Sequence, residues 1–240
     1  MKAYGITDIG RVRDSNQDSF AYSLEQNEAV WAVVCDGMGG ANGGYYASST
    51  ARDVYSQAMN INLNSLKAKQ IENLMTEAVV DANKKIYDTA LNQPDLMGMG
   101  TTLVSAVLVN GEAFIVHVGD SRAYLIRDNE ITQLTEDHSV VQELINLNKI
   151  TKEEAKNHPE KNMITRAVGV RDSVESDINK ISLNKSDAIV LCTDGLSNLV
   201  EDFEILNTVK ENSQQAAAQQ LVSLALSRGG NDNITVVVIK

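Results

Sequence analysis

The chain has 240 residues, of which 43% are hydrophobic and 22% charged, an ordinary composition for a globular protein with a sizeable core. It carries 21 Lys and Arg against 32 Asp and Glu, and the net charge of −11 argues against nucleic acid or an anionic membrane surface as the main partner. No run approaches the roughly 18 apolar residues of a membrane span, and no apolar leader opens the chain. Two cysteines, Cys35 and Cys192, are too few for a disulfide framework and indicate a reducing compartment. We therefore expect one cytoplasmic domain over residues 1–240, acting as a monomer.

The N-terminal half predicts strands followed by two helices. The predicted strands are Ala3–Asp8, Phe20–Ser23 and the continuous apolar run Ala29–Cys35, whose lack of alternation indicates burial on both faces. A glycine-rich turn over residues 36–40 is expected to end the third strand. Helical character follows at Tyr45–Met59, and apolar residues spaced by three or four predict a longer helix over Ser65–Leu91.

The middle of the chain has the composition of consecutive hairpins. Asn110 and Gly111 form a strong hairpin signal, because a type I′ turn needs positive φ at both central positions. Consecutive hairpins pair antiparallel, which excludes a chain of βαβ units. The remaining predicted strands are Thr102–Val109, Glu112–Val118, Ser121–Arg127, Glu130–Leu134, Ile178–Leu183, Ala188–Cys192 and Asn233–Lys240.

Helices are predicted again near the C-terminus, over Glu201–Lys210 and over Ser213–Ser227 with Ser213 as N-cap. Residues 135–168 are polar and contain two short helical pieces, Val140–Leu147 and Lys152–Lys156, so we expect an excursion over the surface. Because strands and helices come in blocks, the prediction is an α+β fold with antiparallel sheet and helices segregated onto its outer faces.

Four aspartates stand at predicted strand ends beside glycine or another turn residue: Asp36, Asp120, Asp194 and Asp232. A charged group at the mouth of a sheet core is costly unless it is paired or bound to a metal. If the strands share a core, the four carboxylates converge into an all-oxygen cage, which suits Mg²⁺ or Mn²⁺. Each aspartate alone is more often a turn residue than a ligand, and Asp120 with Arg122 has the alternative of a surface ion pair. The histidines and cysteines show no ligand spacing, which argues against zinc.

Short motifs follow one another along nearly the whole chain. They are Arg13–Asp18, Asp36–Gly40, Gly98–Leu103, Val118–Ala123, Leu134–Ser139, Thr165–Gly169, Cys192–Leu196 and Asp232–Thr235. In this order the sequence resembles a bacterial member of the PPM family, the metal-dependent type 2C Ser/Thr protein phosphatases.

The resemblance implies a four-layer α-β-β-α sandwich, in which two antiparallel β-sheets pack face to face with helix pairs on both outer faces. It also implies a centre of two Mn²⁺ or Mg²⁺ ions in a cleft at one end of the sandwich. Asp36 would bridge both ions and Gly37 would offer its backbone carbonyl to one of them. Asp194 and Asp232 would hold the other ion, and Asp120 with Asp194 would form a weaker third site.

Further residues acquire roles through the same resemblance. Arg13 would clamp the substrate phosphate, Asp18 would lie behind the ligands and face metal-bound water, and Asn233 would support Asp232. Residues 135–169 would be a flap beside the cleft that tunes substrate access.

The implied activity is hydrolysis of phosphoserine and phosphothreonine on proteins by direct attack of a metal-bridging hydroxide, opposing bacterial Ser/Thr kinases. Phosphoryl transfer needs positioning and charge neutralisation, and metal binding lowers the pKa of water from about 15.7 toward about 7. The expected partners are phosphorylated proteins, a Ser/Thr kinase among them. Two alternatives stay open: a non-catalytic pseudophosphatase that binds a partner, and a phosphatase of an anti-sigma-factor antagonist. The four aspartates argue against the first, and the second differs only in its partner.

Three residues depart from the family pattern. Met38 stands where eukaryotic relatives carry a histidine proposed as general acid, so the proton donor is open. Asn198 stands where those relatives often have another aspartate, which implies a weaker third-metal site. Tyr45 replaces a usual acid near the start of the first helix, with an effect that the sequence does not define.

Other polar residues have simpler interpretations. His117 lies inside a predicted strand and is expected in the core, whereas His138 opens a short helix and is expected to be a cap or surface group. Arg166 predicts an ion pair, with substrate docking as the alternative. Cys35 and Cys192 each lie in an apolar run and are expected in the core.

Overall fold

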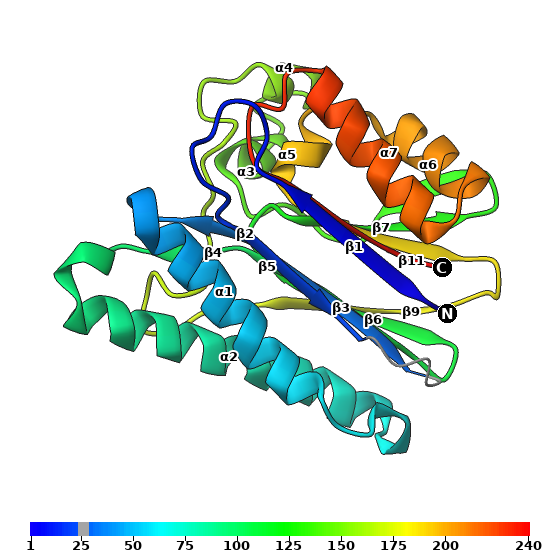
Figure 1. Ribbon diagram of the computed structural model, residues 1–240, viewed down its shortest axis with the longest axis horizontal. Helices are drawn as coiled ribbons and strands as arrows, with labels where there is room; N and C mark the ends of the chain where they lie inside the picture. The colour runs from blue at the N-terminus through cyan, green and yellow to red at the C-terminus, as the bar shows by residue number, and fades with distance from the viewer. Residues whose placement is uncertain (24–28) are drawn as a thin grey trace.

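The computed structural model describes residues 1–23 and 29–240, and its strands form two antiparallel sheets (Figure 1). The first sheet has the order β1-β11-β10-β7-β8, which are Ala3–Asp8, Ile234–Ile239, Ala188–Cys192, Arg122–Arg127 and Glu130–Gln133. The second sheet has the order β2-β3-β5-β6-β9, which are Asp18–Tyr22, Val30–Met38, Leu103–Val109, Glu112–Val118 and Asp177–Ser182. The short β4 (Gly100–Thr101) pairs with the end of β3.

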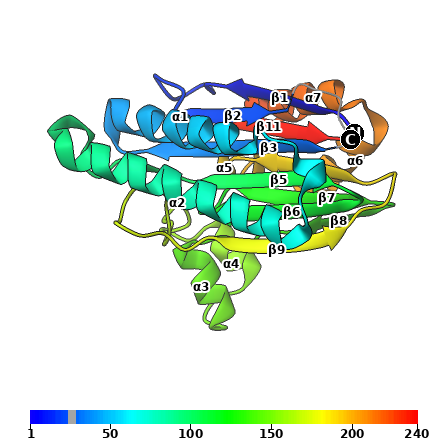
Figure 2. The same ribbon diagram turned by 90° about the horizontal axis from the view of Figure 1, so that it is seen from below.

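Two pairs of helices cover the outer faces of the two sheets (Figure 1). Helices α1 (Gly40–Met59) and α2 (Ala68–Asn92) lie on the second sheet, and α6 (Asp202–Glu211) and α7 (Gln214–Ser227) lie on the first. The shorter helices are η1 (Leu63–Ser65), η2 (Pro94–Leu96), α3 (Val140–Asn146), α4 (Lys152–Lys156) and α5 (Asp194–Ser197). Figure 2 shows α3 and α4 projecting beyond the four layers, as expected of a flap over residues 135–169.

Three separate apolar clusters confirm the predicted four-layer sandwich. Between the sheets, side chains such as Val34 of β3 and Leu191 of β10 belong to one buried cluster. Their chain neighbours Cys35 and Cys192 belong to the two clusters under the helices. Successive residues of a strand point to opposite faces, so a strand buried on both sides reads as a continuous apolar run. Both cysteines are buried in the core, as predicted.

The turn between β5 and β6 has the conformation that the sequence predicts. Asn110 and Gly111 have φ values of 52° and 76°, both positive as a type I′ turn requires. At the other end of the molecule the pairing of Ala3 with Ile239 places the two chain termini side by side (Figure 1). The loops that carry the predicted site residues therefore lie at the end opposite the termini.

The structure differs from the sequence prediction around residues 36–45. Strand β3 does not end at Asp36 but continues to Met38, because Gly37 and Met38 pair with Thr101 and Gly100 of β4. Helix α1 begins at Gly40 instead of Tyr45. Helix α2 begins at Ala68, three residues later than expected, after the separate turn η1.

Within residues 1–23 and 29–240, none of the helices combines the length and the apolar character that crossing a bilayer requires.

Candidate metal centre

A pocket of about 550 Å³ gathers the acidic residues at the end of the sandwich. The predicted site residues that line it are Arg13, Asp36, Gly37, Asp120, Asp194, Asp232 and Asn233. They come from segments far apart in the sequence, and both sheets contribute. Asp36 lies in β3 of the second sheet, while Asp194 follows β10 and Asp232 precedes β11 in the first sheet. Asp120 lies on the connection from β6 to β7, which joins the two sheets.

Burial dominates the electrostatics of these carboxyl groups. Desolvation raises the pKa of Asp36 well above its usual range, and neighbouring carboxylates, Asp18 and Asp194 first among them, raise it further. Desolvation followed by the charge of Asp194 raises the pKa of Asp120 to about 7. Desolvation and the charge of Asp232 raise the pKa of Asp194 to about 6, against a hydrogen bond with Asp36. A bound cation favours the ionised carboxylates and removes the mutual repulsion.

Asp18 lies behind the pocket and is held by two threonines. It faces Asp36 in the register of β2 with β3. Its Oδ2 accepts hydrogen bonds from Thr193 Oγ1 at 2.9 Å and from Thr235 Oγ1 at 2.7 Å, while its Oδ1 is buried without a partner. Desolvation raises the pKa of Asp18 to about 7, although the two threonine hydroxyls oppose that shift. Within the described residues, Asp194 is the other aspartate whose Oδ1 is buried without a hydrogen-bond partner.

Arg13 places a positive charge against the acidic pocket. Its Nη2 contacts Asp232 Oδ2 at 2.7 Å, and its side chain is 55% exposed. The hydrogen bond and charge of Asp232 raise the pKa of the guanidinium. The positively charged guanidinium of Arg13 therefore lies beside the proposed ligand Asp232. Its exposed side chain lines the mouth of the pocket.

Asn233 fixes the loop that carries Arg13. Its Oδ1 accepts a hydrogen bond from the backbone N–H of Gln17 at 2.8 Å, and its Nδ2 donates to the carbonyls of Ile9 at 2.9 Å and Ser15 at 3.0 Å. The backbone N–H of Asn233 also binds Asp232 Oδ1 at 2.8 Å. The sequence predicted a supporting role, and these contacts show what Asn233 supports.

Gly37 brings the backbone of β3 close to α1. A Cβ at this position would lie 2.0 Å from the carbonyl oxygen of Gly44 and 2.7 Å from that of Gln17, so no larger residue fits without a backbone shift. The absence of a side chain lets the Asp36–Gly37 backbone reach the pocket.

The residues of this pocket suit a hard divalent cation. The donors are carboxylate and carbonyl oxygens, and one of them, Asp194 Oδ1, is buried with no hydrogen-bond partner among residues 1–23 and 29–240. The guanidinium of Arg13 contacts the pocket at Asp232. Three carboxylate oxygens of the pocket do not lie within 4.8 Å of one another in the described part of the chain.

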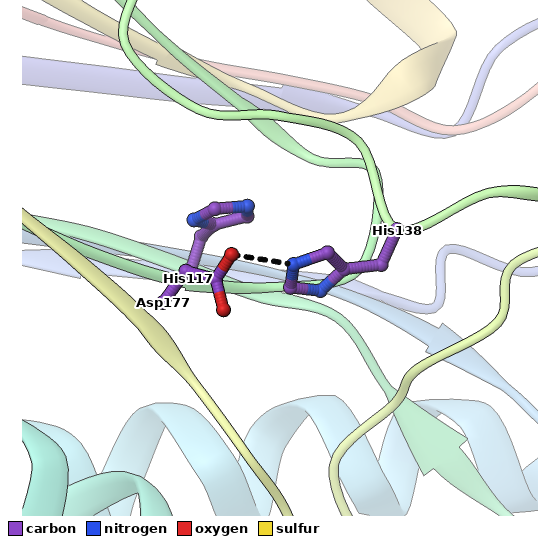
Figure 3. Close-up of side chains that lie close together, drawn as sticks. All are labelled: His117, His138 and Asp177. Carbon is purple, nitrogen blue, oxygen red and sulfur yellow. Dashed lines mark hydrogen bonds and ion pairs between the residues drawn. The ribbon is translucent and has the colours of Figure 1, made fainter. Parts of the chain in front are cut away.

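His117, His138 and Asp177 form a different cluster at the base of the flap (Figure 3). The two rings stack with centroids 4.5 Å apart and planes 24° apart, and His138 Nε2 lies 3.3 Å from Asp177 Oδ2. Because ring nitrogens bind a metal in the plane of the ring, two nearly parallel rings cannot direct their lone pairs at one ion. The cluster is a hydrogen-bonded clamp in this arrangement.

This clamp corrects the prediction for His138. The side chain is 6% exposed instead of lying on the surface, and the N-cap of α3 is Ser139. The Nδ1 atom of His138 accepts a hydrogen bond from the backbone N–H of Gly119 at 3.1 Å, and the backbone N–H of His138 donates to the carbonyl oxygen of Gly119 at 3.0 Å. His138 therefore fixes both backbone groups of the residue before Asp120. The only signal in the sequence was its place in the Leu134–Ser139 motif.

The contacts of His117, Arg166 and Arg122 test three further predictions from the sequence. His117 is buried, as predicted, and its Nε2 contacts the carbonyl of Glu136 at 2.8 Å. The predicted ion pair of Arg166 is present, with Asp177 as partner at 2.8 Å. The alternative of an Asp120–Arg122 pair is wrong, because Arg122 binds Asp137 at 2.7 Å.

The structure also locates the three residues that depart from the family pattern. Met38 lines the pocket and offers no titratable proton. Asn198 donates from Nδ2 to Asp194 Oδ2 at 3.0 Å, so its amide orients a proposed ligand. Tyr45 is exposed on the first turns of α1.

Comparison with known proteins adds independent findings. The family model of Protein phosphatase 2C matches residues 11–227. The chain belongs to the protein phosphatase 2C family. The Serine/threonine phosphatase stp of Listeria welshimeri is 40% identical over 241 residues, which span 100% of this chain and 96% of that relative.

Solved structures from the family share the fold. Serine/threonine phosphatase Stp1 from Staphylococcus aureus superposes with a TM-score of 0.92 at 36% identity, covering 100% of this chain and 95% of that one. The catalytic domain of the serine threonine protein phosphatase PstP in complex with 2 manganese ions has a TM-score of 0.86 at 34% identity, covering 99% and 96%.

Proposed function

We propose that this protein phosphatase 2C family member is a protein-serine/threonine phosphatase, which hydrolyses phosphoserine and phosphothreonine on proteins. The observation that carries the proposal is the convergence of Asp36, Asp120, Asp194 and Asp232 in one pocket with Arg13 at its mouth. Full-length relatives named serine/threonine phosphatases support the substrate class.

Two divalent cations, Mn²⁺ or Mg²⁺, are the cofactors that we assign to the pocket, and the PstP catalytic domain in complex with 2 manganese ions supports a divalent metal. We assign Asp36 to both ions, the Gly37 carbonyl to one, and Asp194 with Asp232 to the other. Asp120 with Asp194 would hold a weaker third ion. When bound, such ions neutralise charge on the phosphoryl oxygens and lower the pKa of a coordinated water.

The protein's own residues position the substrate and handle protons. Arg13 offers a planar pair of N–H donors that match two phosphate oxygens, and the loop that carries it is fixed by Asn233. Asp18 lies behind the ligands, where Thr193 and Thr235 orient its carboxyl group and desolvation raises its pKa to about 7 in the absence of metal. Met38 cannot protonate the leaving serine or threonine oxygen, so that proton comes from a group other than the side chain at this position.

The remaining assignments are extensions of this proposal. We infer a single domain over residues 1–240 that works as a cytoplasmic monomer and opposes a Ser/Thr kinase, with the kinase itself among its phosphorylated substrates. The intact acidic pocket counts against a non-catalytic pseudophosphatase. An anti-sigma-factor antagonist as the substrate would use the same pocket, and hydrolysis of that phosphoprotein tests it directly.

Hydrolysis of p-nitrophenyl phosphate tests the site. We expect turnover with Mn²⁺, none with a chelator, and a fall on the order of 100-fold or more in Asp194→Ala, because the variant lacks a ligand of two of the proposed ions. The control is Asp172→Ala, which removes an exposed carboxylate outside the pocket and should keep full activity. Turnover in the chelator, or full activity in Asp194→Ala, would show that the pocket is not the metal-dependent site.

Arg13→Ala tests the phosphate clamp. Loss of the paired, charge-assisted hydrogen bonds should raise KM for p-nitrophenyl phosphate about tenfold and change kcat less. Arg11→Ala is the matched control, because Arg11 belongs to the same loop but donates to the carbonyl of Leu226. If Arg13→Ala instead weakens only manganese binding, measured by calorimetry, Arg13 is not the clamp.

A further inference from the structure

A second cavity of about 790 Å³ opens from the acidic pocket. The two cavities share Asp120 and Asp194, so they meet at the proposed ligands. The second cavity runs between the flap helices α3 and α4 on one side and the start of α6 on the other. Its size lies in the upper part of the range of about 300–1,000 Å³ that is usual for ligand sites. The proposed ions and the phosphoryl group are assigned to the first pocket, which leaves the second cavity for another part of the substrate.

Apolar side chains line this cavity from both sides, and one of them is largely exposed. Phe203, in the first turn of α6, is 61% exposed, because α6 buries Ile205 and Val209 in the core instead. Five of the apolar residues that line the same cavity are not buried, namely Ile131, Val141, Ile145, Phe203 and Leu206, and we call this set the flap groove. A single exposed phenylalanine is unremarkable, but five apolar side chains around one cavity form a surface that a ligand can desolvate.

Part of the charge around the flap groove is paired within the cavity wall. Arg122 binds Asp137 through both Nε and Nη2, at 2.7–3.1 Å. Lys156 of α4 lies 3.5 Å from Glu153 and 3.5 Å from Glu201, the N-cap of α6, and so links the flap to α6. Glu130, Lys152, Lys161 and Asp202 also line the cavity, so the groove offers an apolar surface within a charged rim.

We propose that the flap groove binds the polypeptide segment next to the phosphorylated residue of a protein substrate, with an apolar side chain of that segment seated on Phe203. This inference rests on the proposed function, because it places the phosphoryl group at the aspartates where the two cavities meet. The chain that carries the phosphorylated side chain has to continue away from the pocket, and the groove begins at that point. Phe203 is then a specificity-determining residue outside the catalytic pocket.

The experiment compares substrates that reach the groove with one that does not. Two phosphothreonine peptides of equal length carry either leucines or glycines beside the phosphothreonine, and p-nitrophenyl phosphate has no flanking segment. We expect wild-type protein with Mn²⁺ to prefer the leucine peptide by about tenfold in kcat/KM, and Phe203→Ala to remove that preference. Phe203→Leu should retain part of it. Hydrolysis of p-nitrophenyl phosphate should stay unchanged in both variants.

Leu91→Ala is the control, because Leu91 is 65% exposed at the end of α2, on the layer away from the groove. It should leave the peptide preference intact. Equal kcat/KM for the two peptides, or a loss in Phe203→Ala that p-nitrophenyl phosphate shares, would overturn the assignment. A dimer in sedimentation that Phe203→Ala converts to monomer would also overturn it, since Phe203 would then face a second copy of the chain.

The same measurements distinguish failure of the phosphatase assignment from failure of the groove assignment. If wild-type protein with Mn²⁺ hydrolyses none of the three substrates, the phosphatase assignment fails. The groove is then tested by binding alone. Fluorescence anisotropy compares the affinities of non-hydrolysable phosphonate analogues of the leucine and glycine peptides for the wild type and for the same variants. Stronger binding of the leucine analogue that is lost in Phe203→Ala supports the groove, and equal binding of both analogues overturns it.

Discussion

Asp18 illustrates how a single carboxyl group is held in an unfavourable position at this site. Its two hydrogen bonds to Thr193 and Thr235 favour the charged form, but desolvation outweighs them and raises its pKa to about 7. The folded, metal-free protein therefore binds a proton that the unfolded chain, with an ordinary aspartate pKa near 4, has already released. Functional sites often retain such strain where a ligand relieves it.

The upward shift of the Asp18 pKa on folding determines how the stability of the metal-free protein depends on pH. Between about pH 4 and about pH 7 the folded state holds more protons at Asp18 than the unfolded state, so stability falls as the pH rises through this window. We expect the thermal midpoint in a chelator to fall from about pH 5 to about pH 8. Asp18→Asn should flatten that slope and raise the midpoint at the upper pH by roughly 4 °C or more. Identical slopes in the wild type, Asp18→Asn and the exposed control Asp172→Asn would contradict the argument.

At the scale of elements, the junction of β3, β4 and α1 determines where Asp36 lies. The last residues of β3 pair with β4, and the first turn of α1 packs its Gly44 backbone directly on Gly37. Asp36 is thus held inside a continuous strand, and the backbone after it cannot relax away from the pocket. Glycine is required at residue 37 for the close approach of two backbones and not for a turn.

Gly37→Ala tests that close approach. The added Cβ would lie 2.0 Å from Gly44 O, so β3 and α1 must separate, and we expect a loss of about 1–3 kcal/mol in the free energy of unfolding together with weaker manganese binding. Gly40→Ala is the matched control: its Cβ meets no atom within 4 Å, and only its positive φ of 74° costs about 1 kcal/mol. Chemical denaturation and calorimetry measure the two effects. Similar manganese affinity in both variants would contradict the proposed role.

Much of the element pattern could be predicted because it depends on local signals. The continuous apolar runs of β3, β5 and β11 report burial on both faces, and the positive-φ pair Asn110-Gly111 defines its own hairpin. The end of β3 and the start of α1 could not be predicted, since they depend on pairing with β4, more than sixty residues away in sequence. His138 was misplaced for a similar reason, because its partners Gly119 and Asp177 come from other elements.

The predicted site depended on a pattern that extends over the whole chain. Each aspartate by itself looked like a turn residue, and only their joint placement at strand ends pointed to one pocket. The structure brings Asp36, Asp120, Asp194 and Asp232 to the same cavity. The hydrogen bonds that hold the pocket, such as those of Asn233 to the Arg13 loop, connect residues more than 200 positions apart and left no signal in local sequence.

At the scale of the whole molecule, the acidic residues come from both sheets and meet where the two sheets adjoin. Asp18 and Asp36 belong to the second sheet, and Asp194 and Asp232 adjoin strands of the first. Asp120 lies on the connection between the sheets. Without cations these carboxyl groups oppose the packing of the sheets at this end, whereas cations shared among them would hold the two sheets together.

Manganese should therefore stabilise both sheets at once. Ligand that binds only the folded state at about 100 times its Kd adds about 2.7 kcal/mol, which is a rise of roughly 5–10 °C in the thermal midpoint of a chain of this size. Hydrogen exchange should slow in β2 and β3 and also in β10 and β11, because the proposed ligands adjoin strands of both sheets. Asp194→Ala should lose most of the rise, whereas Asp172→Ala should keep it. A rise of equal size in Asp194→Ala, or protection confined to one sheet, would show that the cations do not join the two sheets through these aspartates.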